Sequence, residues 1–152
     1  MISFHIESFE ERLDELKVLL PAHYKELALN QDSVPLDPQY SVYIEHERKG
    51  GLLFVVLRDA GEMIGYYIGF IAPGLHYKTC LTCTTDIFFV RADKRGGKAG
   101  IKMFQFVEKE LKRRGVKRWF TGSKVAHDAS ALFEFLKFDK VEIYYSKWLG
   151  ES

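Results

Sequence analysis

The residues from Asp86 to Leu111 read DIFFVRADKRGGKAGIKMFQFVEKEL, and the rest of the chain is best interpreted around them. The apolar run from Ile87 to Val90 predicts a buried strand. A polar turn with two adjacent glycines follows, and apolar residues then recur at helical spacing from about Ala99. The first N–H groups of a helix have no internal partner and lie at the positive end of its dipole. Because glycines let the backbone approach a ligand closely, the stretch favours a cradle for a pyrophosphate.

The spacing of the glycines excludes two common phosphate-binding motifs. A nucleotide P-loop needs Gly-Lys followed by Ser or Thr, whereas Ile101 stands just past this turn. A dinucleotide fingerprint needs Gly-x-Gly-x-x-Gly, and glycines at 96, 97 and 100 do not have that first spacing. A tight turn from strand to helix, with no ligand, is the alternative that these residues leave open.

Size and composition limit the class of protein. The chain has 152 residues, 47% of them apolar, and a net charge of +1, which predicts a single globular domain over residues 1–152. Such a charge gives no reason to expect a nucleic-acid or membrane partner. No apolar run approaches the ~20 residues that span a bilayer, and no signal peptide is visible, so we expect a cytoplasmic protein. Cys80 and Cys83 are expected to be reduced thiols, and no metal is expected.

The order of predicted elements begins with a strand, helices and a hairpin. Residues 1–6 predict a strand, and Ser8 is a plausible start for a helix. Pro21 is predicted to begin a second short helix that runs through Leu29, because proline suits the first helical position. A further helix is predicted at 38–48, and β-prone runs at 52–57 and 63–72 predict an antiparallel hairpin.

The second half of the chain completes the predicted fold. A strand at 82–90 leads into the glycine turn, Gly115 ends the main helix, and residues 117–121 predict a short strand. A helix is predicted at 129–138 and a closing strand at 141–148. The predicted fold class is therefore α/β, with a mixed, mostly antiparallel central sheet and helices on both faces.

Two segments carry a resemblance to a known family. The loop from Arg95 to Gly100 resembles the Arg/Gln-x-x-Gly-x-Gly/Ala loop of the GNAT N-acetyltransferases, with Lys98 at the middle glycine. Residues 129–138 resemble that family's Ala-x-x-Leu-Tyr-x-x-Leu-Gly-Phe segment. Phe133 replaces the tyrosine, Lys137 replaces the glycine, and the asparagine expected upstream falls on Ala126. The predicted element order also matches the GNAT fold.

The resemblance implies a cofactor site and candidate catalytic residues. Acetyl-CoA is the implied cosubstrate, with its pantetheine on the strand main chain and its pyrophosphate on the glycine loop. Asp86 is the candidate base, on a strand face expected to include Thr84 and Phe88. Tyr145 is the candidate general acid, in place of the tyrosine that Phe133 replaces. The implied cofactor-binding residues are Phe88, Phe89, Val90, Arg95, Gly96, Gly97, Lys98, Ala99 and Gly100.

The function that the resemblance implies is direct acetyl transfer to an amine within a ternary complex. The acceptor, a small molecule or a protein, is not identified by any motif, and the choice between a monomer and a homodimer stays open. The basic run from Lys109 to Arg118 is interpreted as a solvated helix end because no aromatic platform for nucleic acid is interleaved with it. The alternatives are a catalytically silent GNAT-like module that binds a protein or nucleic acid, and transfer of a larger acyl group.

Overall fold

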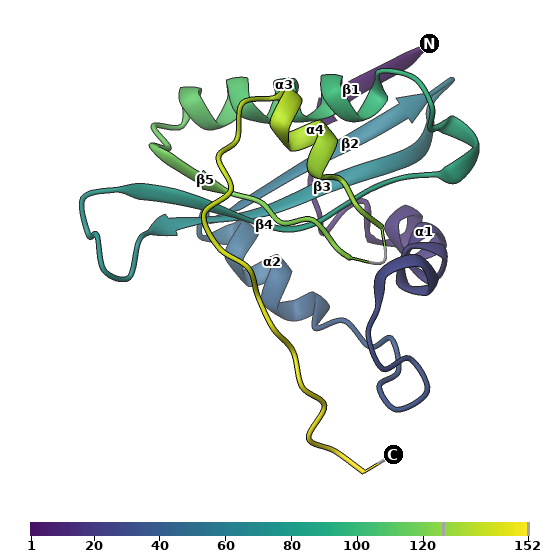
Figure 1. The fold of residues 1–152 in the computed structure, drawn as a ribbon. Coiled ribbons are helices and arrows are strands. Elements are labelled where there is room, and N and C mark those ends of the chain that lie inside the picture. The colour runs from purple at the N-terminus through teal and green to yellow at the C-terminus, as the bar shows by residue number, and fades with distance from the viewer. Residues whose placement is uncertain (126, 152) are drawn as a thin grey trace.

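The computed structural model describes residues 1–125 and 127–151 and shows one five-stranded sheet (Figure 1). Ala126, where the asparagine of the resemblance falls, lies outside the described residues. The strands lie in the order β1-β2-β3-β4-β5, with antiparallel pairing through β4 and parallel pairing between β4 and β5. They are β1 (Ile2–Ile6), β2 (Leu52–Asp59), β3 (Glu62–Pro73), β4 (Leu81–Val90) and β5 (Arg118–Phe120).

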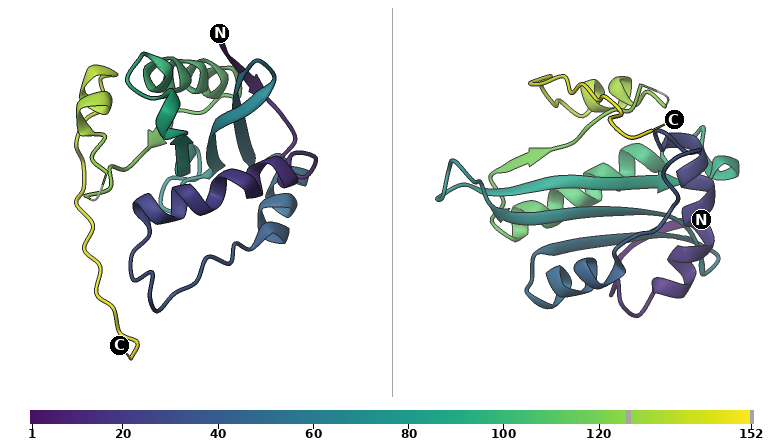
Figure 2. Two further views of the ribbon diagram at one scale, coloured as in Figure 1. Left: turned by 90° about the vertical axis from the view of Figure 1, so that its right-hand side faces the viewer. Right: turned by 90° about the horizontal axis from the view of Figure 1, so that it is seen from below.

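Helices cover both faces of this sheet, so the predicted fold class is confirmed (Figure 2). On one face, α1 (Leu13–Leu27) and α2 (Tyr40–Arg48) close an apolar layer with β2, β3 and β4. On the other face, α3 (Ala99–Arg113) and α4 (Ser130–Phe135) close a second layer. A short 3-10 turn, η1 (Ala92–Lys94), joins β4 to the glycine loop. Among the described residues no helix is both long and apolar enough to cross a membrane.

The predicted break at Pro21 is wrong, because α1 continues through this proline to Leu27. Proline in a helix interior removes one backbone hydrogen bond and costs roughly 3 kcal/mol. The same helix buries Leu16, Leu20 and His23 against the sheet. Burial of such a face contributes about 1.5–3 kcal/mol for each large apolar side chain, so tertiary packing outweighs the local preference.

The predicted closing strand at residues 141–148 is also wrong. After α4 the chain takes the left-handed conformation at Lys137 (φ 69°), the position where the resembling motif has glycine. It then leaves the sheet as an extended tail (Figure 1). Val141 and Ile143 are exposed in this tail, so their alternating pattern is not buried against any face. A lone strand has little stability in water without a pairing partner, which is why the sequence pattern alone does not produce one.

Candidate functional site

A bulge in β4 sets the position of Asp86. Ile87 pairs with Ile68 of β3 while Thr85 pairs with Gly69, so Asp86 is the extra residue on its strand. A bulge of this kind interrupts the alternation of side chains and re-aims one of them. Asp86 is directed to the α2 side, whereas the Phe88 ring packs 5.1 Å from Phe104 of α3 on the opposite face. The expectation that Asp86 and Phe88 share a face is therefore wrong.

The Asp86 carboxylate is held by a tyrosine of α2. The Tyr43 hydroxyl donates a 2.5 Å hydrogen bond to Oδ2 of Asp86. Partial burial raises the pKa of Asp86, whereas the Tyr43 hydrogen bond and the Lys124 charge act to lower that pKa. Burial, together with the neighbouring carboxylate, raises the pKa of Tyr43, so its hydroxyl stays a donor. A carboxyl group with a raised pKa on a strand bulge is suited to accept a proton.

The edge of β4 that faces β5 is paired only at its beginning. β5 pairs with Thr82, Cys83 and Thr84, and from Thr85 to Val90 no described strand lies on that side. β4 therefore runs on alone toward the glycine loop. Main-chain groups on such an open edge are a template for an extended ligand. The predicted pantetheine contacts at residues 88–90 all lie on this open portion.

The loop between Arg95 and Gly100 presents main-chain donors. Lys98 is the N-cap residue of α3, no side chain caps the helix, and its first turn has no acidic residue. Within the described chain, no acceptor is bonded to the backbone N–H groups of residues 96–101. Gly96 has φ 94°, and a Cβ atom at Gly97 would meet no atom within 4 Å. Free N–H groups, open space and the helix dipole together fit a pyrophosphate.

The Arg95 side chain ties this loop to α1. Its Nε donates to the Val90 carbonyl at 2.6 Å, and one terminal nitrogen donates to both carboxylate oxygens of Glu26 at 2.8 and 2.7 Å. The guanidinium also lies 5.3 Å from the centre of the Phe89 ring. Lys98, by contrast, forms no ion pair among the described residues. The two predicted phosphate ligands thus differ: the arginine is already paired, and the lysine is not.

A cavity of about 250 Å³ lies between α1, α2 and the sheet. Tyr43 and Ile87 both line this cavity, so the Asp86 carboxylate is at its edge. His23 of α1 also lines it, with Nδ1 at 2.5 Å from the Tyr66 hydroxyl and its ring stacked on Phe89. Burial lowers the pKa of His23 to about 4, so its ring is neutral at pH 7.

Sequence reasoning missed the contributions of Tyr43 and His23. Tyr43 lies 43 residues before Asp86, and His23 lies 43 residues before Tyr66. Neither pair belongs to a short motif, and the helices that carry them show only ordinary amphipathic patterns. Neither residue was therefore indicated by the sequence alone.

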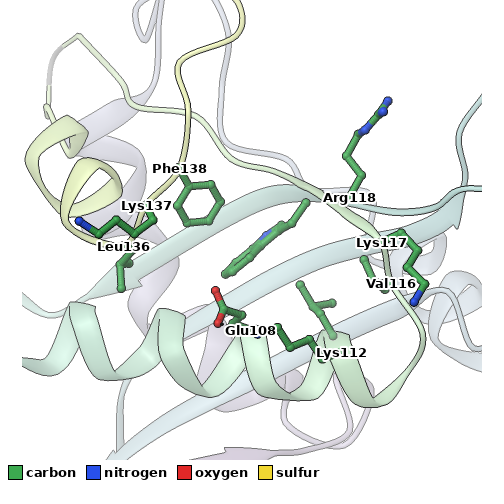
Figure 3. A pocket seen from close by; sticks show the side chains of 10 residues that line it. Glu108, Lys112, Val116, Lys117, Arg118, Leu136, Lys137 and Phe138 are labelled. Atoms are coloured by element: carbon green, nitrogen blue, oxygen red, sulfur yellow. Dashed lines mark hydrogen bonds and ion pairs between the residues drawn. The ribbon is translucent and has the colours of Figure 1, made fainter.

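A second hollow, of about 220 Å³, lies between α3, β5 and the residues that follow α4 (Figure 3). It takes in part of the basic run, including Lys112, Lys117 and Arg118. Glu108 forms an ion pair with Lys112 at 3.3 Å at this hollow. No residue predicted to be catalytic or cofactor-binding lines it.

The structure does not bring the two predicted catalytic residues together. Tyr145 is 91% exposed and lies in the tail outside the sheet, so its role as general acid stays a prediction. Phe133, at the motif's tyrosine position, is buried among the rings of Phe88 and Phe104 at 5.9 and 5.3 Å. Burial raises the pKa of the Cys83 thiol to about 11, which leaves it protonated. No group of three or more potential metal ligands occurs among the described residues.

Comparisons with known proteins support the fold. No protein-family model matches the sequence, and no curated protein matches it. Among solved structures, a ribosomal-protein-alanine N-acetyltransferase from Brucella melitensis biovar Abortus 2308 is 14% identical in sequence, with a TM-score of 0.74. The match covers 99% of this chain and 100% of that one. An aminoglycoside acetyltransferase from an uncultured soil metagenomic sample has 13% identity and a TM-score of 0.77, covering 99% of each chain. A predicted acetyltransferase with acetyl-CoA from Clostridium acetobutylicum is 12% identical, with a TM-score of 0.74, and the match covers 98% of this chain and 97% of that one.

Proposed function

The chain has the fold of the GNAT acetyltransferases, and we propose that it transfers an acetyl group from acetyl-CoA to an amine by direct transfer in a ternary complex. One observation carries the proposal. The N–H groups of residues 96–101, which have no acceptor among the described residues, come one short 3-10 turn after the open edge of β4, and the same strand holds Asp86 in its bulge. A phosphate cradle, an edge for an extended chain and a carboxylate therefore occur along one strand and its loop.

The residues around the glycine loop fit the cosubstrate. Acetyl-CoA supplies the acetyl thioester. The N–H groups of Gly97 to Gly100 are free to donate to its pyrophosphate, and Lys98 is free to add a charge-assisted contact. The main chain of Phe88 and Phe89 lies on the part of β4 that β5 does not cover, as an extended pantetheine needs, whereas the Val90 carbonyl is already bonded to Arg95. The ion pair between Arg95 and Glu26 attaches the loop to α1.

Asp86 is proposed to accept the proton of the acceptor amine. An ammonium has no lone pair, so it must lose a proton before its nitrogen forms a bond to the acetyl carbon and the carbon–sulfur bond breaks. The raised pKa of Asp86 brings the carboxylate closer to the range in which a base works at neutral pH. The Tyr43 hydrogen bond keeps the carboxylate oriented toward the cavity side. The nitrogen loses its second proton as the amide forms, and the departing thiolate takes up one proton. The products are then the amide, the CoA thiol and one proton held by Asp86.

A silent binding module is the second candidate. Phe133 cannot donate a proton, and the aromatic cluster around it leaves no hydroxyl at the motif's tyrosine position. In this reading the glycine loop holds CoA as a structural ligand or is a turn without a ligand.

Two measurements on the purified protein separate these candidates. The first is the melting temperature with acetyl-CoA, which should rise because a ligand of the folded state stabilises that state by mass action. The second is release of free CoA thiol in the presence of a panel of primary amines. Binding with amine-dependent release supports the acetyltransferase. Binding without release from any amine supports the silent module, and no binding at all removes the proposal.

A further inference from the structure

We infer that the cavity beneath α1 and α2 binds a compact monoamine whose carbon skeleton is apolar, such as an arylalkylamine. This inference rests on the proposed function, because it names the acceptor class of the same site. It is drawn from three features of the cavity: its lining, its charges and the position of Asp86 at its edge.

The lining is mostly apolar, and its apolar residues include some from α1, the linker after it and the sheet. Leu16, Leu20 and Leu27 of α1 form one wall, Leu36 of the following linker closes a second, and Ile68 of β3 lies in the sheet floor. Nine of the fourteen lining residues are apolar, so an occupant gains mainly from burial of its hydrocarbon surface. The volume of about 250 Å³ lies below the usual range for drug-sized ligands, which favours a small occupant.

The linker that closes the cavity is attached to α1. The Tyr24 hydroxyl donates to the Val34 carbonyl, and the Gln31 side chain donates to the Ala28 carbonyl at 3.0 Å. Val34 and Leu36 are each 40% exposed, but only Leu36 lines the cavity. Hydrogen bonds therefore attach this linker to α1, and of its two apolar side chains Leu36 lines the cavity and Val34 does not.

The charges around the cavity oppose a polycation. None of the described residues that line the cavity is acidic, and the one charged residue among them is Lys124. Glu26 of α1 is already paired with Arg95. A single ammonium group can reach the Asp86 carboxylate at the edge. Further cationic groups inside the cavity would meet Lys124 and apolar walls, because Asp37, which lies between Leu36 and Pro38 and acts on Tyr40, does not itself line the cavity. A buried charge without a partner is costly, so one amine is accepted and several are not.

The neutral His23 adds a polar contact at the inner end. Its Nδ1 is engaged by Tyr66, and its Nε2 has no hydrogen-bond partner among the described residues. Because the pKa of this ring is lowered to about 4, it does not add a positive charge to the cavity at neutral pH. A neutral ring beside apolar walls is compatible with an aromatic body in the occupant.

The test is binding of two amines to the full chain, measured by calorimetry with the protein alone and with the protein saturated with CoA, so that no transfer occurs. The probes are 2-phenylethylamine and spermidine. We expect 2-phenylethylamine to bind at least about tenfold more tightly than spermidine. Leu36→Glu should weaken binding of 2-phenylethylamine by about tenfold, because it places a charge on the apolar wall. The matched variant Val34→Glu should change it less than about twofold.

The results of this test separate failure of the cavity inference from failure of the proposed function. Equal or tighter binding of spermidine overturns the inference, as does an equal effect of the two glutamate variants or no binding of 2-phenylethylamine in either state. Should spermidine be the better ligand and also be acetylated, the apolar acceptor is wrong but the proposed function stands. Should the amine preference and the Leu36→Glu effect hold while acetyl-CoA does not bind, the cavity inference stands and the proposed function falls.

Discussion

The glycine loop and the amine cavity lie near the same strand but are built in different ways. The loop is six consecutive residues, Arg95 to Gly100, and the contacts proposed for it are made by main-chain N–H groups. The cavity is lined by side chains from Phe9 to Lys124, brought together by two helices, a linker and the sheet. Main-chain recognition needs only a short local motif, whereas side-chain recognition depends on the whole tertiary arrangement.

This difference has a consequence for specificity. Changes of side chain in the loop leave its N–H donors in place, provided that the backbone path is kept. Changes in the cavity alter the surface that an acceptor touches. We therefore expect cofactor binding to respond to backbone changes and acceptor binding to respond to side-chain changes, and the following variants test that division.

The largest effect is expected for Asp86→Asn. The asparagine keeps the size of the side chain and an oxygen for the Tyr43 hydrogen bond, but it cannot accept the amine proton. We expect kcat to fall by about 100-fold, within the usual range for general bases. The dissociation constant for acetyl-CoA should stay within about twofold, since the carboxylate is not part of the loop. Matching pH–rate profiles in the two proteins would assign proton removal to another group.

A tenfold or greater effect is expected for Gly100→Val, and it falls on the cofactor. A Cβ atom at this position would lie 3.7 Å from a methyl group of Leu132, which is an ordinary contact, so the Cβ itself adds no clash. The added methyl groups should block close approach of the pyrophosphate and weaken acetyl-CoA binding at least tenfold, about 1.4 kcal/mol. Binding of 2-phenylethylamine should be unchanged.

Lys98→Ala is the matched change of side chain in the same loop. Its effect on acetyl-CoA affinity should be smaller than that of Gly100→Val and should shrink at high salt, because an exposed charge is screened. Circular dichroism and melting of both variants check the fold. A well-folded Gly100→Val protein that binds acetyl-CoA as tightly as the parent would place the cradle elsewhere.

The smallest effect is expected for Tyr43→Phe, as a shift of the pH profile. The tyrosine hydrogen bond stabilises the ionised form of Asp86 and so lowers its pKa. Its loss should raise that pKa and move the acidic limb of kcat/KM to higher pH. Tyr40→Phe is the control, because Tyr40 lines the same cavity and has no hydrogen bond to Asp86 among the described residues. A shift to lower pH, or the same shift in both variants, would contradict this role.

The sequence predicted the parts of the fold that local patterns determine. The hairpin of β2 and β3, the strand β4 and the helix α3 were all predicted within a few residues, because their apolar periodicities are strong. The glycine loop was predicted as a motif, and its free N–H groups were expected from helix geometry alone. The fold predicted from the resemblance is confirmed by the structural neighbours.

What the sequence did not predict depends on contacts between distant residues. The bulge at Asp86 exists only relative to β3, so alternation along β4 gave the wrong face for Phe88. The Tyr43 hydrogen bond and the neutral His23 need α1 and α2 to be placed on the sheet first. The tail at 141–148 has a strand-like pattern, but a segment forms a strand only where a neighbouring strand can pair with it, and the segment's own sequence does not reveal this.

Equilibrium dialysis of acetyl-CoA against the wild-type chain tests the central claim most directly. If the open edge of β4 and the loop from Arg95 to Gly100 hold this cosubstrate, binding should saturate at one acetyl-CoA for each chain. The concentration needed should be no more than about 1 mM, the upper end of ordinary substrate constants. Absence of saturable binding at that concentration, by a protein whose circular dichroism shows it to be folded, would contradict the account.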